Sequence, residues 1–193
     1  SEMCIRDRFR KMNPTYRFRI EYKYTSIIVN DVLQGNSELG LCSNLSPDDP
    51  ALCSLDRRVI HKEPVGLIVG KNHPFAHRSS VSVEDLRDER FIVYIRSFRG
   101  TNQMLYDLCS PYGFEPNIVM EAYNDYGVLN SVASGDGIAI IPTTRFLERP
   151  DVVRIPLDLK EPLMRDLTLV WRKNEKLPPA AAAFRDMLIS TAQ

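Results

Sequence analysis

The chain has 193 residues, of which 44% are hydrophobic and 26% charged, the balance of an ordinary globular protein long enough to bury a core. Twenty-five basic and 25 acidic side chains give a formal net charge of +0, which argues against a chain that binds nucleic acid over its whole surface. No apolar run approaches the roughly 18 residues of a membrane span, and four cysteines without close pairing favour a reduced, cytoplasmic protein.

Strand and helix patterns alternate along the first part of the chain. Residues 16–22 alternate apolar and charged side chains, which predicts a half-buried strand. Thr25 and Ser26 can cap a following helix, and Gly35 is expected to end it. Further strands are predicted at 38–42, 55–61 and 65–69.

The second half repeats a unit of strand, polar turn and helix. A strand at 91–95 leads to a helix that opens at Thr101, and a strand at 118–120 leads to a helix capped by Asn124 and closed by Gly135. Strands at 138–141 and 167–171, and a last helix beginning at Pro178 or Pro179, complete the chain. Short apolar strands between amphipathic helices predict an α/β protein with parallel sheets.

The loops from strand to helix are the places to look for a ligand, because ligands bind beyond the carboxyl ends of parallel strands, where helix N-termini also point. These loops contain 43–44, 96–101, 123–124 and Thr143. The loop 96–101 combines guanidinium groups, free backbone N–H groups and a hydroxyl, as a carboxylate or phosphate ligand requires. Equally consistent with the sequence is a Thr101 that only caps the helix, beside solvated arginines.

The sequence holds no recognisable metal, cofactor or catalytic motif. His73 and His77 are four residues apart, but Pro74 disfavours a helix that would place them on one face, so a turn is expected there. There is no GxSxG elbow, and residues 135–137 lack the third glycine of a dinucleotide fingerprint. We therefore expect no catalytic residues, no metal and no cofactor.

Five segments, taken in order, resemble one protein family. They are Phe9-x3-Asn13-Pro14; Leu33-x-Gly35 leading into Glu38-Leu39-Gly40-Leu41; Asn72-His73-Pro74-Phe75-Ala76 before Val83-x2-Leu86; Val132 to Pro142; and Leu167-x-Leu169-Val170-Trp171-Arg172. In this order and spacing they resemble the effector-binding (co-inducer) domain of LysR-type transcriptional regulators, from about Phe9 to Leu188.

The resemblance implies an α/β fold with two Rossmann-like lobes, of the type 2 periplasmic-binding-protein-like kind. Two crossover strands, at 64–70 and 165–172, would join the lobes. Lobe 1 would comprise residues 1–68 and 166–193, and lobe 2 residues 69–165. An effector cleft is expected between the lobes.

The resemblance also implies a function. A small anionic metabolite would bind in the cleft and control DNA binding and transcription by the full-length protein, without catalysis or a cofactor. The family pairs its domains antiparallel, so we expect a homodimer or higher homo-oligomer, with the helices at 25–34 and 124–134 as contacts. Carried over by position, the effector-binding residues would be Ser43 and Asn44 in lobe 1 and Arg96, Ser97, Thr101, Tyr123 and Asn124 in lobe 2.

The chain departs from the family pattern at its start. A winged helix-turn-helix and linker helix are not found, so DNA contacts are expected only through a domain outside these residues. Residues 1–8 are charged where the family's first strand is apolar, which implies a truncated chain or foreign residues and a lobe 1 without that strand.

The rival function is a solute-binding protein of a transporter, which uses the same fold. Such a protein needs export, and the missing signal peptide and the cysteine usage favour the regulator. An enzyme on this fold would need a set of catalytic residues, and the sequence shows none that we recognise, so this third function is not favoured.

Overall fold

Two units make up the fold. The computed structural model describes residues 2–43, 45, 50–95, 102–143 and 149–192, with 2–6 described by their backbone alone. Unit 1 comprises Ser1–Lys62 and Asp166–Gln193, and unit 2 comprises Glu63–Arg165. Strand β2 (Leu55–Gly70) carries the chain from unit 1 into unit 2, and β7 (Met164–Arg172) carries it back. The expected lobe boundary after residue 68 and the division after residue 62 both fall inside β2.

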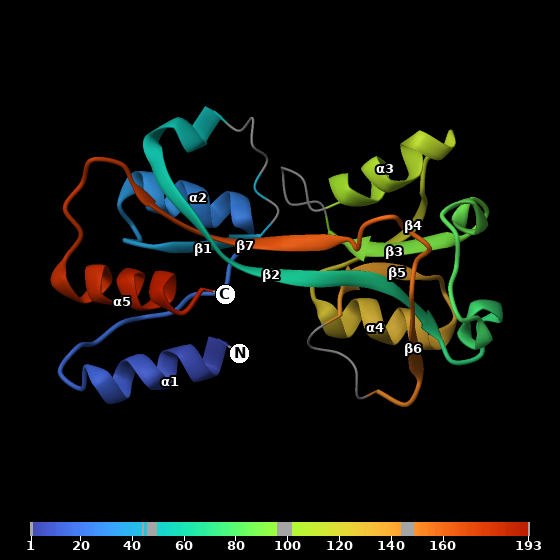
Figure 1. The fold of residues 1–193 in the computed structure, drawn as a ribbon, viewed down its shortest axis with the longest axis horizontal. Helices are drawn as coiled ribbons and strands as arrows, with labels where there is room; N and C mark the ends of the chain where they lie inside the picture. Colours follow the sequence, from blue (N-terminus) through green and yellow to red (C-terminus); the bar gives the residue numbers. More distant parts are fainter. Residues whose placement is uncertain (1, 44, 46–49, 96–101, 144–148, 193) are drawn as a thin grey trace. The chain divides into compact units, whose positions relative to one another are not determined.

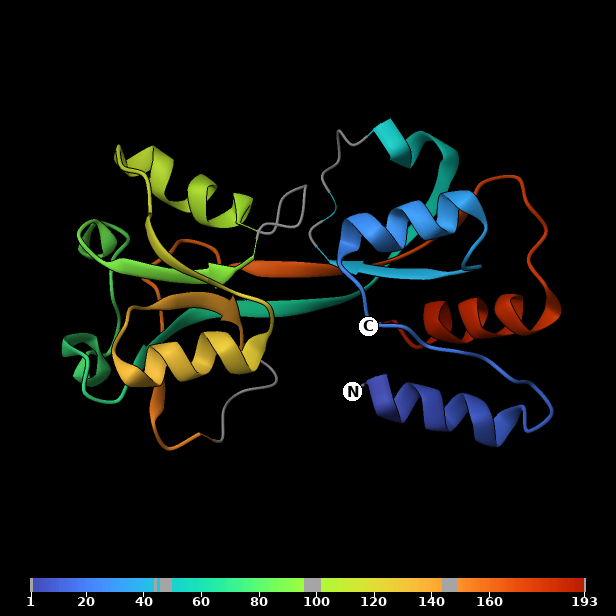
Figure 2. The ribbon, with the colours of Figure 1, turned by 180° about the vertical axis from the view of Figure 1, so that it is seen from behind.

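In unit 1, two helices cover opposite faces of a pair of strands. Strand β1 (Gly40–Ser43) pairs antiparallel with β7, and helices α2 (Thr25–Gln34) and α5 (Pro179–Ser190) lie on either side of them (Figures 1 and 2). Alternation along β7 explains the arrangement, since Val170 packs in the cluster of α2 and Leu169 in the cluster of α5. A 3-10 turn, Pro50–Ser54, precedes β2.

A helix that the sequence did not predict begins the chain. Helix α1 (Glu2–Met12) packs against α5 through Phe9, which is 2% exposed and whose ring centroid lies 4.9 Å from that of Phe184. The predicted strand at 16–22 is wrong, because this segment forms no regular structure. Its first two aromatic rings instead pack on Phe9, while Tyr22 is 80% exposed. Apolar and charged side chains do alternate in residues 16–22, but the segment pairs with no described strand.

The predicted helix at 25–34 is confirmed as α2, but the predicted capping of this helix by Thr25 and Ser26 is wrong. Tyr24 is its N-cap, without a side-chain capping bond, while the hydroxyl of Thr25 donates to the carbonyl oxygen of Ser43 at 3.0 Å. A long-range bond has therefore replaced the local one, and it fastens the first turn of α2 to the end of β1. The end of the helix is as predicted, at Gly35 with φ 77°.

In unit 2, a mixed layer of strands replaces the fully parallel sheet that was expected. Strands β3 (Arg90–Tyr94) and β4 (Asn117–Ala122) pair in parallel, whereas β5 (Ala139–Pro142) and β6 (Val152–Ile155) pair antiparallel with β2. The segments 55–61 and 65–69, expected as two strands, form the single strand β2, and β6 was not predicted. The α/β class is confirmed, with helices α3 (Gln103–Cys109) and α4 (Asp125–Ser134).

A close approach of two backbones joins β3 to the start of β5. The N–H of Ile92 donates to the carbonyl of Ile138, and the N–H of Ile138 donates to that of Arg90, both at 2.8 Å. A Cβ on Gly137 would lie 2.4 Å from the Arg90 carbonyl oxygen, so only glycine permits this contact. Gly135, with φ 84°, ends α4 as predicted. The Gly-Asp-Gly stretch therefore serves packing and capping.

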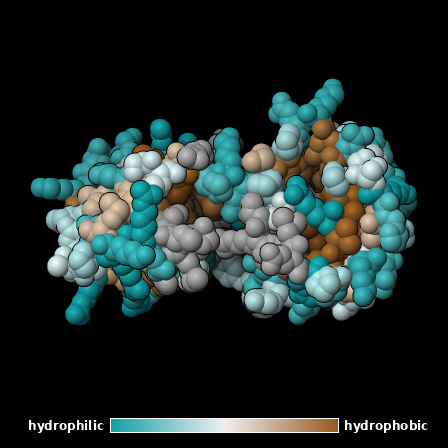
Figure 3. All heavy atoms as spheres, turned by 60° about the horizontal axis from the view of Figure 1, so that its bottom comes forward, coloured by the Kyte–Doolittle hydropathy of each residue, from teal (hydrophilic) through white to brown (hydrophobic). Residues whose placement is uncertain are grey.

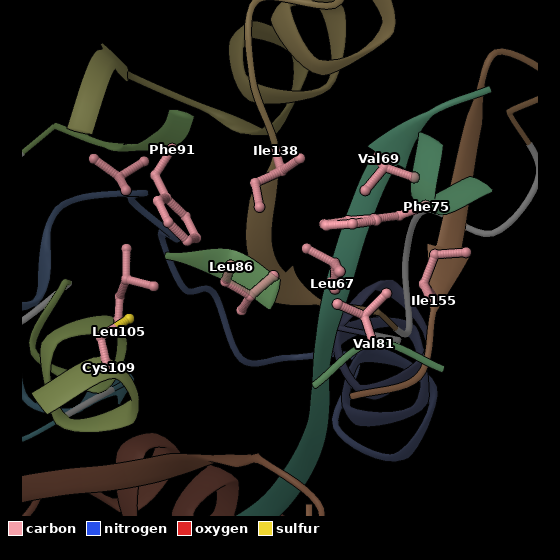
Figure 4. Packing of buried hydrophobic residues seen from close by; sticks show 11 residues of the cluster. Leu67, Val69, Phe75, Val81, Leu86, Phe91, Leu105, Cys109, Ile138 and Ile155 are labelled. Atoms are coloured by element: carbon pink, nitrogen blue, oxygen red, sulfur yellow. The ribbon is translucent and has the colours of Figure 1, made fainter. Parts of the chain in front are cut away.

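Helices α3 and α4 cover opposite faces of this layer (Figures 1 and 2). Phe91 packs with Leu105 and Cys109 of α3 in the cluster shown in Figure 4. Ile92, the next residue, packs with Val128 of α4. Successive strand residues thus feed two cores, as an α/β layer requires.

One buried ion pair links β2 and β7 inside unit 2. Glu63 is only 4% exposed, and its carboxylate accepts hydrogen bonds from Nε (3.1 Å) and Nη2 of Arg165. Both bonds end on the same carboxylate oxygen, Oε2, and the guanidinium group balances a charge that would otherwise be costly to bury. In unit 1, Lys62 and Asp166 form an exposed pair at 3.8 Å.

Candidate functional site

Three strand ends meet at one edge of unit 2. Strands β3 and β4 are parallel, and a parallel bridge joins β3 to the start of β5. Ile95, Tyr123 and Thr143 therefore follow their strands at the same edge. The N–H of Ile95 donates to the carbonyl of Ala122 at 2.9 Å, which holds the first two ends side by side. Loops at this edge carry most of the predicted effector contacts.

Asn124 caps helix α4 at this edge, as predicted. Its backbone is extended (φ −155°, ψ 173°), and its side-chain oxygen accepts the N–H of Gly127 at 3.0 Å. A Cβ on Gly127 would lie 2.9 Å from the Ala122 Cβ, so glycine lets the first turn of α4 approach the end of β4. The cap uses the amide oxygen, and none of the described residues accepts a hydrogen bond from the amide N–H groups of Asn124.

Two further side chains fix the residues that flank the loop 96–101. The hydroxyl of Tyr94 donates to the carboxylate of Asp125, which ties the end of β3 to α4. Asn102, which is buried, donates from its amide nitrogen to the carbonyl oxygen of Tyr94 at 3.3 Å. Asn102, which follows residues 96–101, is thereby joined directly to the end of β3, which precedes them. The sequence did not single out these three residues, although each lies within two residues of a loop that it did indicate.

Thr143 has a structural role. It is buried, and both its N–H and its hydroxyl donate to the carbonyl oxygen of Pro64, at 2.9 and 3.2 Å. Its hydroxyl therefore holds the end of β5 against β2.

Unit 1 contributes the end of β1 and a hollow beside it. Ser43 is the last residue of β1, and its carbonyl holds Thr25. Thr168 stands opposite Cys42 in the ladder of β1 and β7. It belongs to the lining of a hollow of about 490 Å³, whose described lining residues are Leu45, Arg57, Arg58, Val59, Asp166 and Thr168.

The predicted effector residues are only partly described. Tyr123, which is 73% exposed, and Asn124 lie together at the edge of unit 2, and Ser43 lies in unit 1. The other four predicted contacts, Asn44, Arg96, Ser97 and Thr101, lie outside the described residues.

The described side chains of His73, Cys42 and Cys109 lie in surroundings that support the fold. The Nδ1 atom of His73 accepts the N–H of Phe75, and its Nε2 lies 3.3 Å from Glu89, so the expected turn at His73 is confirmed. In the described part of the chain, no three His, Cys, Asp or Glu residues gather as a metal site would need. Burial raises the pKa of the Cys42 thiol to about 12 and that of Cys109 to about 11. None of the described helices has the length and apolarity to cross a membrane.

Comparison with known proteins gives one family. The model of the LysR substrate binding domain matches residues 4–193. The transcriptional dual regulator GltC of Bacillus subtilis is 24% identical over 183 residues, which cover 94% of this chain and 59% of GltC. The HTH-type transcriptional regulator AlsR, also of Bacillus subtilis, is 28% identical over 177 residues, covering 88% of this chain and 55% of AlsR. The chain spans less than two thirds of these regulators.

Solved structures share the fold. The effector binding domain of QuiR, in complex with shikimate, superposes with a TM-score of 0.87 at 21% identity, covering 100% of this chain and 90% of that one. The Synechocystis PCC6803 CcmR regulatory domain, in complex with 2-PG, gives a TM-score of 0.86 at 17% identity, covering 100% and 91%. The predicted type 2 periplasmic-binding-protein-like fold is confirmed.

Proposed function

The chain belongs to the LysR substrate-binding domain family, and we propose that it senses a small anionic metabolite for a LysR-type transcriptional regulator. The observation that carries the proposal is the family match over residues 4–193, which includes every strand end described above. Similar domains hold shikimate in QuiR and 2-PG in CcmR, which supports a small-molecule ligand here.

The proposed contacts come from the strand ends of both units. In unit 2, Tyr123 and the N-cap residue Asn124 directly precede the first turn of α4, where the partial positive charge of a helix favours an anion. Ser43 offers a hydroxyl at the end of β1 in unit 1. The proposed set is completed by Asn44, Arg96, Ser97 and Thr101. A carboxylate or phosphate suits these donors.

The proposed mechanism is a shift between two arrangements of the lobes. A metabolite that contacts strand ends of both lobes binds a closed arrangement more tightly than an open one, and that difference in affinity shifts the equilibrium. In a full-length regulator, the shift changes how the subunits present a DNA-binding domain outside these residues. The sensing chain itself performs no catalysis in this proposal and needs no cofactor.

We further propose that the domain pairs with a second copy through α2 and α4. Ile27 on α2 is 45% exposed and Tyr126 on α4 is 77% exposed, so each helix presents apolar area. Figure 3 looks toward the α4 side of unit 2 and shows apolar atoms at the surface there. Light scattering at tens of micromolar should give the mass of a dimer, and a monomer would contradict the proposed pairing.

A screen of metabolites by thermal shift tests the proposed function. An organic acid present at 100 times its dissociation constant should stabilise the domain by about 2.7 kcal/mol, or roughly 5–10 °C in Tm. Arg96→Ala should then weaken the binding of that acid, measured by calorimetry, without lowering Tm. Arg17→Ala removes an exposed charge of unit 1 and should leave the affinity for the acid unchanged. A library in which no acid raises Tm would contradict the proposal.

A further inference from the structure

Both strands that connect the two units carry an ion pair on each side of the division. Strand β2 passes from unit 1 to unit 2 between Lys62 and Glu63, and β7 returns between Arg165 and Asp166. The two strands are neighbours in one sheet, and the residues on each side of the division pair across them. Because the chain passes between the units only at these points, the backbone near them must absorb any movement of one unit against the other.

The ion pair on the unit 2 side is buried and directional. Glu63 is 4% exposed, and its carboxylate accepts hydrogen bonds from Nε and Nη2 of Arg165. A hydrogen-bonded charge pair holds its partners in one geometry, whereas apolar packing has no preferred direction. Two residues further along β2, the N–H of Val65 donates to the carbonyl oxygen of Leu163 at 2.9 Å. These bonds fix β2 and β7 in register at the edge of unit 2.

The rest of β2 inside unit 2 is held as firmly. The carbonyl oxygen of Pro64 accepts the N–H and the hydroxyl of Thr143, at 2.9 and 3.2 Å. Strands β5 and β6 pair with β2 between Val65 and Gly70, and all six residues of this stretch are buried. Bending here would break hydrogen bonds and expose apolar side chains, so it is opposed.

On the unit 1 side, the same strands are held far less. Five of the six residues 57–62 of β2 are exposed, and on β7 the buried residues begin only at Thr168. The ion pair on this side joins Nζ of Lys62 to Oδ1 of Asp166 at 3.8 Å, with 64% and 46% of the two side chains exposed. Such a pair contributes little to stability and is weakened by salt. Residues 61–62 and 166–167 therefore lose the fewest interactions when the strands bend.

From this contrast we propose that the pair of Glu63 and Arg165 is a clamp, which fixes β2 against β7 and confines the bending of both strands to residues 61–62 and 166–167. The inference rests on the proposed function, because the bend serves the shift between the open and closed arrangements of the lobes. Glu63 and Arg165 are positioning residues. They touch no ligand in this proposal, and they act on its affinity by setting where the strands bend.

Amide hydrogen exchange, followed by NMR on the 193-residue chain, tests the clamp without a ligand. In the wild type, the amide of Val65 should exchange slowly, and the amides of residues 61, 62 and 166 should exchange at least about tenfold faster. Exchange at Val65 as fast as at residues 61 and 62 would place the bend inside the clamp and overturn the proposal.

A variant without the charges separates the clamp from a contribution to stability alone. Glu63→Leu combined with Arg165→Met leaves no buried charge unpaired, so its Tm should stay close to that of wild type. Exchange at Val65 should nevertheless quicken at least about tenfold, because apolar packing lets the strands twist, while exchange at buried Leu169 stays unchanged. Lys62→Ala, the matched control, removes the exposed pair and should change neither rate.

Arg165→Lys gives a second test that does not depend on the folding of the double variant. It keeps the positive charge but loses the planar guanidinium group, and should quicken exchange at Val65 to a smaller extent. Wild-type exchange at Val65 in Arg165→Lys and in the double variant would overturn the clamp. An equal quickening at Val65 and Leu169 would also overturn it, because it would show a general loss of stability.

The acid found by the thermal-shift screen supplies the readout that a merely structural pair would not move. The double variant should bind this acid about threefold to thirtyfold more weakly than wild type, because a smaller fraction of the chain is then in the closed arrangement. Lys62→Ala should bind it as wild type does. Equal affinity of wild type and the double variant overturns the clamp and leaves the sensing function standing. The proposed function fails separately, when no acid raises the Tm of wild type.

Discussion

Asn124 carries two separable roles in this account, and two substitutions should divide them. Its side-chain oxygen caps α4 through the 3.0 Å bond from Gly127, and its amide donors are proposed to meet the effector. Asn124→Ala removes the cap, which costs about 1 kcal/mol or roughly 2–4 °C in Tm for a chain of this length. Asn124→Asp keeps an acceptor of equal capping quality, so its Tm should stay close to that of wild type.

The effector should rank the two variants in the opposite order. Asn124→Ala loses one hydrogen bond to the ligand, about 1 kcal/mol, and should bind roughly fivefold more weakly. Asn124→Asp sets a negative charge near the anion, and at about 5 Å with an effective dielectric constant of 20 the repulsion is about 3 kcal/mol. Its affinity should fall roughly a hundredfold.

Calorimetry with the acid found by the screen, and thermal unfolding without ligand, give the two rankings. The account predicts that Asn124→Asp is the more stable variant and the weaker binder. If Asn124→Asp binds the acid as tightly as wild type does, the anion does not lie at the first turn of α4. If Asn124→Ala unfolds at the wild-type temperature, the reasoning about the cap is refuted.

Three further predictions concern stability, measured by urea unfolding. Phe9→Ala should lower the free energy of unfolding by about 3–5 kcal/mol, because this buried ring packs α1 onto α5. The control, Met12→Ala at an exposed position of the same helix, should lower it by less than about 0.5 kcal/mol. Equal losses in the two variants would show that α1 is not packed on α5. Arg165→Ala leaves buried Glu63 unpaired and should cost about 3 kcal/mol, and a loss under 1 would contradict this burial. Because burial raises the pKa of the Cys42 thiol from 9.0 to about 12, the unfolded state loses its proton first as pH rises from 9 to 12, and this thiol's contribution to stability falls by up to about 1.4 kcal/mol per pH unit. Cys42→Ala should lose that part of the slope, and an unchanged slope would contradict it.

Local signals in the sequence explain why much of unit 2 could be predicted. Asn124 before an apolar helix and Gly135 after it are start and stop signals that depend only on nearby backbone, and both act as expected. Residues 16–22 show the limit of such signals. Alternation identifies a segment that could form half of a strand pair, but a strand also needs a neighbour, and here the aromatic rings pack on Phe9 instead.

The candidate site divides in the same way. The rule that ligands lie beyond strand ends selects Ser43, Tyr123 and Asn124 from the sequence, because the rule needs only the order of strands and helices. Arg57 and Thr168 were missed because they become neighbours only through the packing of β2 and β7, more than a hundred residues apart. The pairing of Glu63 with Arg165 was out of reach for the same reason.

The most direct test of the central claim is an amide NMR titration of this chain with the acid that the thermal-shift screen selects. The account predicts that the largest shifts fall on the ends of β1, β3 and β4 and on the first turn of α4, at Ser43, Ile95, Tyr123 and Asn124. Shifts confined to α1 and α5, or none in the presence of a stabilising acid, would contradict a sensing site at the strand ends.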